Sequence, residues 1–97
     1  MYVGALQVQI RILEAFSLKD KRRVLKSVCE KTSRKYDFSC AEVGDLELIN
    51  LASLGFSCVS NSFSHVDDRL NTLIEYLDND YRFEIVNIGR DIINVVD

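Results

Sequence analysis

The sequence predicts an α+β sandwich with the element order strand, helix, strand, strand, helix, strand. Three observations indicate this order. Residues 2–14 alternate between apolar and other side chains, two segments beginning near Ser17 and Ser62 have apolar residues at helical spacing, and strand-like runs follow each helix. Right-handed crossovers would place both helices on one face of a four-stranded antiparallel sheet. We therefore expect a ferredoxin-like βαββαβ fold.

The first strand, at residues 2–14, is expected to have one buried face and one wetter face. The apolar side chains that share one side of it are Leu6, Val8, Ile10 and Ile12. Ser17 then caps a helix that continues to about Tyr36, because its hydroxyl can accept a backbone N–H of the first turn. Asp20, at the third helical position, is expected to accept the N–H of Ser17 in a short version of the capping box.

The rest of the chain supplies the second half of the sandwich. The elements expected there are a strand at 38–43, a turn at 44–45, a strand at 54–61, a helix capped by Ser62 or Ser64 and ending at 79–80, and a strand at 83–93. Residues 46–53 fit either a short helical turn or an extension of a strand. No linker or low-complexity segment divides the chain, so residues 1–97 are expected to form one domain.

Charge is distributed unevenly along this acidic chain. Residues 18–36 hold eight basic and two acidic residues, a net charge of +6, while the whole chain carries −3, so the other residues sum to −9. The candidate anion-binding residues, which share the outer side of the first helix, are Lys19, Arg22, Arg23, Lys26 and Arg34. Such a stripe can steer an anionic partner, but charged residues on the outer side of a helix commonly only face water. Both interpretations remain open from the sequence.

The cysteines and the hydropathy pattern suggest a location for the protein. Cys29, Cys40 and Cys58 are an odd number without C-x-x-C spacing, and the N-terminus lacks the pattern of a signal peptide. We therefore expect three reduced thiols in a cytoplasmic protein. One histidine and three scattered cysteines make a metal site unexpected, and the short apolar runs leave no segment able to span a membrane.

No motif for catalysis or for a cofactor is evident. His65 is the only histidine, and we expect no serine or cysteine to be placed locally to act with it. Residues 60–62 could hold an anion on backbone N–H groups, but helix capping is the better explanation for them. Residues 14–17 lack the glycine-rich phosphate cradle of an acylphosphatase-like enzyme, and Phe56 is expected in the core rather than on an RNA-stacking sheet face. We expect neither an enzyme nor a bound cofactor.

Several short motifs occur in order along the chain. They are V-G-x-L-x-V-x-I at 3–10, S-L-K-D-K-R-R-V-L-K-S at 17–27, S-C-A-E-V at 39–43, L-G at 54–55 and V-S-N at 59–61. Together they resemble the YlxP-like family, a group of small bacterial domains of unknown function. The resemblance implies a ferredoxin-like fold and, from the genes that neighbour such family members, a link to ribosome or RNA work. Many relatives carry Asp-His after the A-E-V motif where this chain has Gly44-Asp45, so no role for that histidine carries over.

Three functional hypotheses follow from these features. The first is a non-enzymatic module that docks its basic helix on structured RNA, ribosomal RNA above all, with phosphate contacts that depend on salt. The second is a self-associating or protein-interaction module, because an open four-stranded sheet leaves one face and two edges uncovered. The third is a regulatory domain of the ACT kind that binds a small molecule at a dimer interface. We expect RNA or the ribosome as partner, with a homodimer as the alternative and no role for a membrane.

Overall fold

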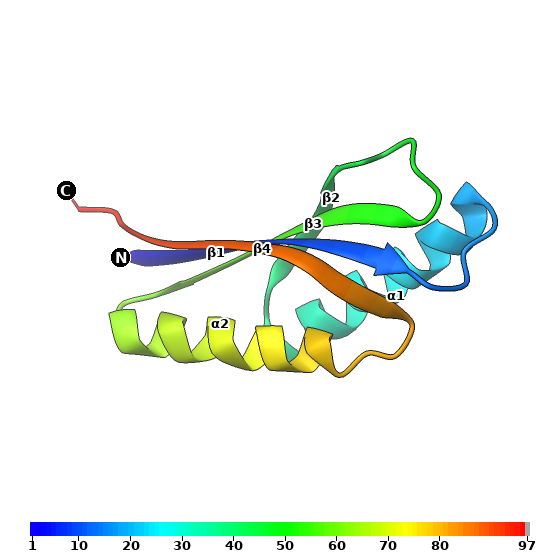
Figure 1. Cartoon of the computed structure of the whole chain (residues 1–97). Coiled ribbons are helices and arrows are strands. Elements are labelled where there is room, and N and C mark those ends of the chain that lie inside the picture. Colours follow the sequence, from blue (N-terminus) through cyan, green and yellow to red (C-terminus); the bar gives the residue numbers. More distant parts are fainter. Residues whose placement is uncertain (97) are drawn as a thin grey trace.

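The computed structural model describes residues 1–96 and has the predicted fold (Figure 1). Its elements are β1 (Tyr2–Ile12), α1 (Leu18–Tyr36), β2 (Ser39–Gly44), β3 (Leu51–Ser60), α2 (Phe63–Asp78) and β4 (Phe83–Asn94). The strands pair antiparallel in the order β2-β3-β1-β4. Figure 1 shows both helices on one side of the sheet, so the other face is left open. The ferredoxin-like sandwich expected from the sequence is confirmed.

The predicted bounds differ from the observed ones mainly at strand ends. β1 ends at Ile12, and Leu13 lies in the turn that follows, where the N–H of Leu13 donates to the carbonyl of Arg82 at 3.1 Å. The ambiguous stretch 46–53 divides between two structures. Residues 45–50 form the β2–β3 loop, while Leu51 begins β3 by pairing with Arg11 of β1.

The core lies between the helices and the covered face of the sheet. Even-numbered positions of β1 and β3 are paired across the ladder and point to the helices, as in the pairs Leu6–Phe56 and Val8–Leu54. The strand and helix side chains buried there include Ile10, Ile12, Leu25, Val28, Ala52, Cys58, Val66, Leu70, Leu73 and Leu77. Phe56 is a core residue, as predicted. α2 packs so closely on β1 that a Cβ atom at Gly4 would lie 2.6 Å from a methyl group of Val66.

Serine caps both helices, with one difference from the prediction. Ser17 Oγ accepts the N–H of Asp20 at 3.1 Å, and Ser62 Oγ accepts the N–H of His65 at 3.3 Å. Asp20 Oδ2 accepts the N–H of Phe16 at 3.0 Å, whereas the N–H of Ser17 was the expected donor. The side chain of Asp20 therefore reaches one residue further back and fixes the backbone that enters α1.

The expectation of three reduced thiols is wrong for two of them. Cys29 of α1 and Cys40 of β2 are joined as a disulfide, with their Cα atoms 5.3 Å apart. Their separation of eleven residues gave no sign of a pair, because only the packing of α1 on β2 brings them together. Cys58 is free, as expected, and it is buried. Because two of the three cysteines form a disulfide, the cysteines no longer support a cytoplasmic location. That location stays a prediction.

Candidate functional site

The five predicted anion-binding residues share the exposed side of α1. Lys19, Arg22, Arg23, Lys26 and Arg34 are all exposed, while the opposite side of the helix buries Leu25, Val28 and Thr32. Among residues 1–96, Lys26 is the one member of this set with an ion pair, to Glu30 at 3.9 Å with both side chains largely in solvent. Such a pair holds its partners weakly. We call these five residues the basic face; its positive charges are available to a partner.

Lys21 is basic but belongs to the core, and sequence reasoning missed this. Its side chain is 1% exposed, and Nζ donates to the carbonyl oxygens of Asp45 at 2.7 Å and Leu48 at 2.6 Å. Glu42 Oε2 lies 2.9 Å from the same nitrogen. The ammonium group thus joins α1 to β2 and to the β2–β3 loop. The signal was its position four residues before Leu25 and seven before Val28, on the apolar side of the helix.

Asp45 completes the fixation of this loop. It adopts a left-handed conformation with φ of 60°, which aspartate tolerates better than most residues. Its Oδ2 atom accepts hydrogen bonds from Ser53 Oγ at 2.6 Å and Gln9 Nε2 at 3.1 Å. The bonds from Ser53 and then Gln9 lower the pKa of the Asp45 carboxyl below its ordinary value. The loop is therefore held from both sides, by Lys21 on its carbonyls and by β1 and β3 on Asp45.

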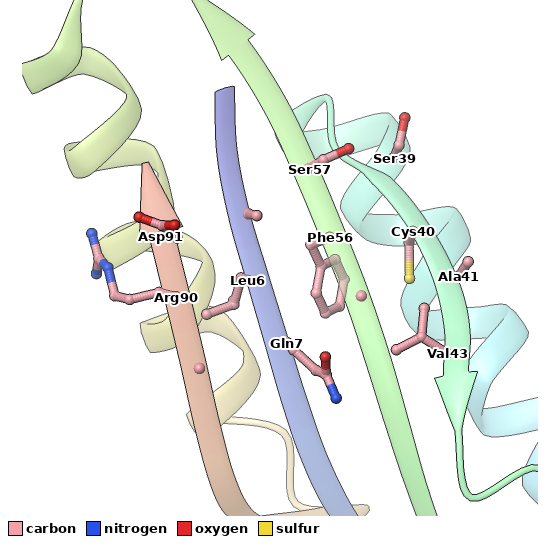
Figure 2. Close-up of a pocket in the computed structure, with 13 residues that line it drawn as sticks. Leu6, Gln7, Ser39, Cys40, Ala41, Val43, Phe56, Ser57, Arg90 and Asp91 are labelled. Atoms are coloured by element: carbon pink, nitrogen blue, oxygen red, sulfur yellow. The ribbon is translucent and has the colours of Figure 1, made fainter. Parts of the chain in front are cut away.

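A second candidate site is a shallow groove of 570 Å³ on the open face of the sheet. Figure 2 shows the residues that line it on all four strands, with the helices behind the sheet. The ladder places a row across its middle in which three of the four residues are small, in the order Ala41, Gly55, Gln7 and Gly89. The adjacent row is Ser39, Ser57, Ala5 and Asp91. Most side chains in these two rows are small, and Asp91 is the one charged residue among them. In the whole chain, 28% of the residues are charged.

The middle row of this groove consists of side chains without a titratable group. Gln7 is the one amide in the middle row, and the row contains no acid, base or nucleophile. It also has no aromatic ring exposed for base stacking, because Phe56 points to the core. The two rows that form the floor of the groove therefore offer neither a positive charge for a phosphate nor an aromatic ring for a base.

The prediction that no serine lies close to His65 is wrong. Ser60 Oγ lies 3.1 Å from His65 Nδ1, because β3 ends directly before the turn into α2. Ser60 Oγ also accepts the N–H of Ser62 at 3.2 Å, so it belongs to the capping network of α2. Among residues 1–96, no third group orients His65, and neither side chain lines one of the cavities described. The geometry supports capping.

Other classes of site find no support in the described part of the chain. No group of three or more histidine, cysteine, aspartate or glutamate side chains within residues 1–96 is arranged to hold a metal ion. Neither α1 nor α2 is long and apolar enough to cross a membrane.

Comparison with known proteins agrees with the resemblance seen in the motifs. The model of a family described as "Protein of unknown function (DUF503)" matches residues 3–90. The uncharacterized protein YlxP of Bacillus subtilis (strain 168) is 29% identical over 76 residues, which cover 78% of this chain and 83% of that protein. Because the family match spans nearly the whole sandwich, from β1 to the middle of β4, this chain belongs to the DUF503 family.

Proposed function

We propose that this protein is a non-enzymatic accessory protein of the cytoplasm that binds structured RNA, ribosomal RNA above all, through the basic face of α1. The observation that carries the proposal is the exposure of Lys19, Arg22, Arg23, Lys26 and Arg34 on one side of one rigid helix, four of them without an ion-pair partner among residues 1–96. Phosphate groups are the ligands that such a stripe suits best. The family resemblance, with its link to ribosome work, points the same way.

The acidic remainder of the chain limits how RNA can bind. The net charge outside residues 18–36 is −9, and the isoelectric point of the sequence is about 5.1. Most of the surface therefore repels a polyanion, and only the basic face attracts it. We expect moderate affinity, strong dependence on salt and little preference for base sequence from these contacts alone.

The test compares two variants that change the net charge equally. In the first, Lys19, Arg23, Lys26 and Arg34 are all replaced by glutamine. In the control, four exposed residues elsewhere become glutamate, at positions Asn61, Thr72, Asn87 and Asn94. Binding of a labelled ribosomal RNA fragment is measured by fluorescence anisotropy. The glutamine variant should lose binding while the control retains most of it; equal loss in both would show that only net charge matters, and no loss in the first would refute the proposal.

A second candidate function is self-association through the open face of the sheet. Four strands of 11, 6, 10 and 12 residues, spaced about 4.8 Å apart, cover roughly 600 Å² of flat area, which side chains raise toward the roughly 800 Å² per partner of a standard interface. The two rows described above favour it, because Asp91 is their one charged residue and charged residues are depleted at the centres of protein interfaces. The two functions use opposite faces of the molecule and are compatible.

A further inference from the structure

Phe16 is almost fully exposed at the entrance to α1. Its side chain is 84% exposed, although its backbone N–H is fixed by Asp20. A hydrophobic residue directly before an N-cap commonly packs on the residue at the fourth helical position. That position is Lys21 here, whose side chain is turned into the core. The ring of Phe16 therefore has no structural partner of the usual kind, while its backbone is held in place.

A second exposed ring borders a hollow at the same end of the molecule. Tyr81, in the α2–β4 loop, is 90% exposed. It borders a cavity of 320 Å³ whose other lining residues are Ile12, Leu13, Glu14, Val24 and Arg82. The β1–α1 and α2–β4 loops meet there, as the hydrogen bond from Leu13 to Arg82 shows (Figure 1). The hollow is mostly apolar, and its volume is in the range of small-ligand sites.

One cation of the basic face, Arg23, lies near the flank of α1 that faces this end of the molecule, and a second, Lys19, is close to Phe16 in the sequence. Ser27 Oγ accepts a hydrogen bond from Arg82 Nη1 at 3.0 Å, which fixes the side of α1 that faces the α2–β4 loop. Arg23 is one helical turn before Ser27 and shares that side. Lys19 is one further turn back and three residues after Phe16. Exposed rings and exposed positive charges thus occur together at this end.

We infer that this end binds unpaired nucleotides, so that the target of the basic face is a single-stranded or looped segment of RNA and not a plain duplex. The inference rests on the proposed function and adds to it the class of RNA. Bases would stack on Phe16 and Tyr81, since aromatic rings accept any base and strengthen binding without sequence preference. Lys19 and Arg23 would contact the adjoining phosphates.

The chemistry of the hollow favours a base over a phosphate. Glu14 lines it, and the guanidinium group of Arg82 is already engaged by Asp80 at 2.6 Å. A phosphate entering the hollow would meet the carboxylate of Glu14 without a free positive charge. The amino group of a base could instead donate to that carboxylate. Phosphates are therefore expected on the flank of α1 and bases toward the hollow.

The test uses two labelled RNAs in fluorescence anisotropy, a single strand of about twelve unstructured nucleotides and the perfect duplex of the same sequence. The charge density of a duplex is higher, so electrostatics alone would favour the duplex. The inference predicts tighter binding of the single strand by the wild-type protein. Phe16→Leu and Tyr81→Leu should each weaken single-strand binding by about tenfold, while changing duplex binding little.

Two further variants make the test specific to the ring. Phe16→Tyr keeps an aromatic surface and should bind the single strand as the wild type does. Phe63→Leu removes a half-exposed ring that packs on Tyr2 at the other end of the sandwich, and it should have no effect. Unchanged single-strand binding by Phe16→Leu and Tyr81→Leu, or tighter binding of the duplex, would overturn the inference while leaving the basic face as an RNA surface. Failure of the wild type to bind either RNA would instead overturn the proposed function.

Discussion

Lys21 Nζ lies 2.9 Å from Glu42 Oε2 and links α1 to β2 in a region that water barely reaches. Within residues 1–96, no hydrogen bond of good geometry reaches that carboxylate oxygen. The positive charge of Lys21 therefore compensates the buried negative charge of Glu42. The same ammonium group donates to two carbonyls of the β2–β3 loop. The motif at 17–27 therefore contains both a structural cation, Lys21, and four of the five cations of the basic face.

Replacing Lys21 by methionine should destabilise the fold by about 3 kcal/mol, because it leaves the carboxylate of Glu42 and two loop carbonyls without their partner. The free energy of unfolding in urea measures this. Lys19→Met, which removes an exposed cation from the same helix, should change it by less than about 0.5 kcal/mol. Equal effects of the two substitutions would contradict the structural role of Lys21.

The ion pair of Asp80 and Arg82 should make the free energy of unfolding depend on pH in the acidic range. Partial burial raises the pKa of Asp80, but hydrogen bonds from the side chain and backbone of Arg82 lower it more, so the carboxyl titrates below its ordinary value. The ionised carboxyl of Asp80 therefore makes its full contribution to the free energy of unfolding above about pH 3.9, which is the pKa of an aspartate in the unfolded chain. This contribution is lost as the pH falls through the lower pKa of Asp80 in the folded protein. Asp80→Asn should cost about 1–2 kcal/mol at neutral pH.

The pH dependence separates this charge effect from a change of shape. The difference in unfolding free energy between the wild type and Asp80→Asn should begin to shrink below about pH 4, where the carboxyl of the unfolded chain becomes protonated. It should vanish only below the lower pKa of the folded protein, where both side chains are neutral. Asp78→Asn, at an exposed position close by, serves as the control for removing a carboxylate from this region. A difference for Asp80→Asn that stays constant down to about pH 2 would contradict the prediction.

The disulfide between Cys29 and Cys40 should stabilise the protein by lowering the conformational entropy of the unfolded chain. The two residues are eleven apart, and closing a loop of this size is worth about 2–3 kcal/mol in the chain-entropy account. Cys29→Ser with Cys40→Ser should lose that amount, and adding reductant to the wild type should have the same effect. A count of free thiols in the denatured, unreduced protein should give one per chain, from Cys58. Three free thiols would contradict the bond.

Self-association through the open face can be tested at Gly89. A Cβ atom added there meets nothing within 4 Å, so Gly89→Lys places a charge in the groove without disturbing the protomer. If the open face is an interface, sedimentation at about 100 μM should show a dimer for the wild type and a monomer for this variant. Thr72→Lys, on the exposed side of α2, should leave the dimer intact. A monomeric wild type would remove this second candidate.

Much of the fold could be predicted because periodicity determines it locally. The alternation of β1 gave its buried residues correctly, and Ser17 and Ser62 are the observed caps. The exposure of the five residues of the basic face also follows directly from helical spacing. These features depend on neighbours within a few residues, which a single sequence contains.

The features that were missed depend on residues distant in the chain. The pairing of Cys29 with Cys40, the contact of Ser60 with His65 and the burial of Lys21 against the β2–β3 loop all require two elements to meet. The exposure of Phe16 likewise could not be predicted from the sequence, because a phenylalanine beside an N-cap more often packs on the first turns of the helix. Periodicity indicates which side of an element is buried but not which partner it meets.

The most direct test of the central claim is the salt dependence of RNA binding. Five phosphate contacts predict that affinity for a single strand falls about a hundredfold between about 50 and 200 mM salt, and affinity for a duplex about five-hundredfold. Fluorescence anisotropy with the wild type should show this decline, and the variant with glutamine at positions 19, 23, 26 and 34 should bind weakly with a nearly flat dependence. Wild-type binding that is insensitive to salt, or that the glutamine variant retains in full, would contradict the assignment of the basic face to RNA.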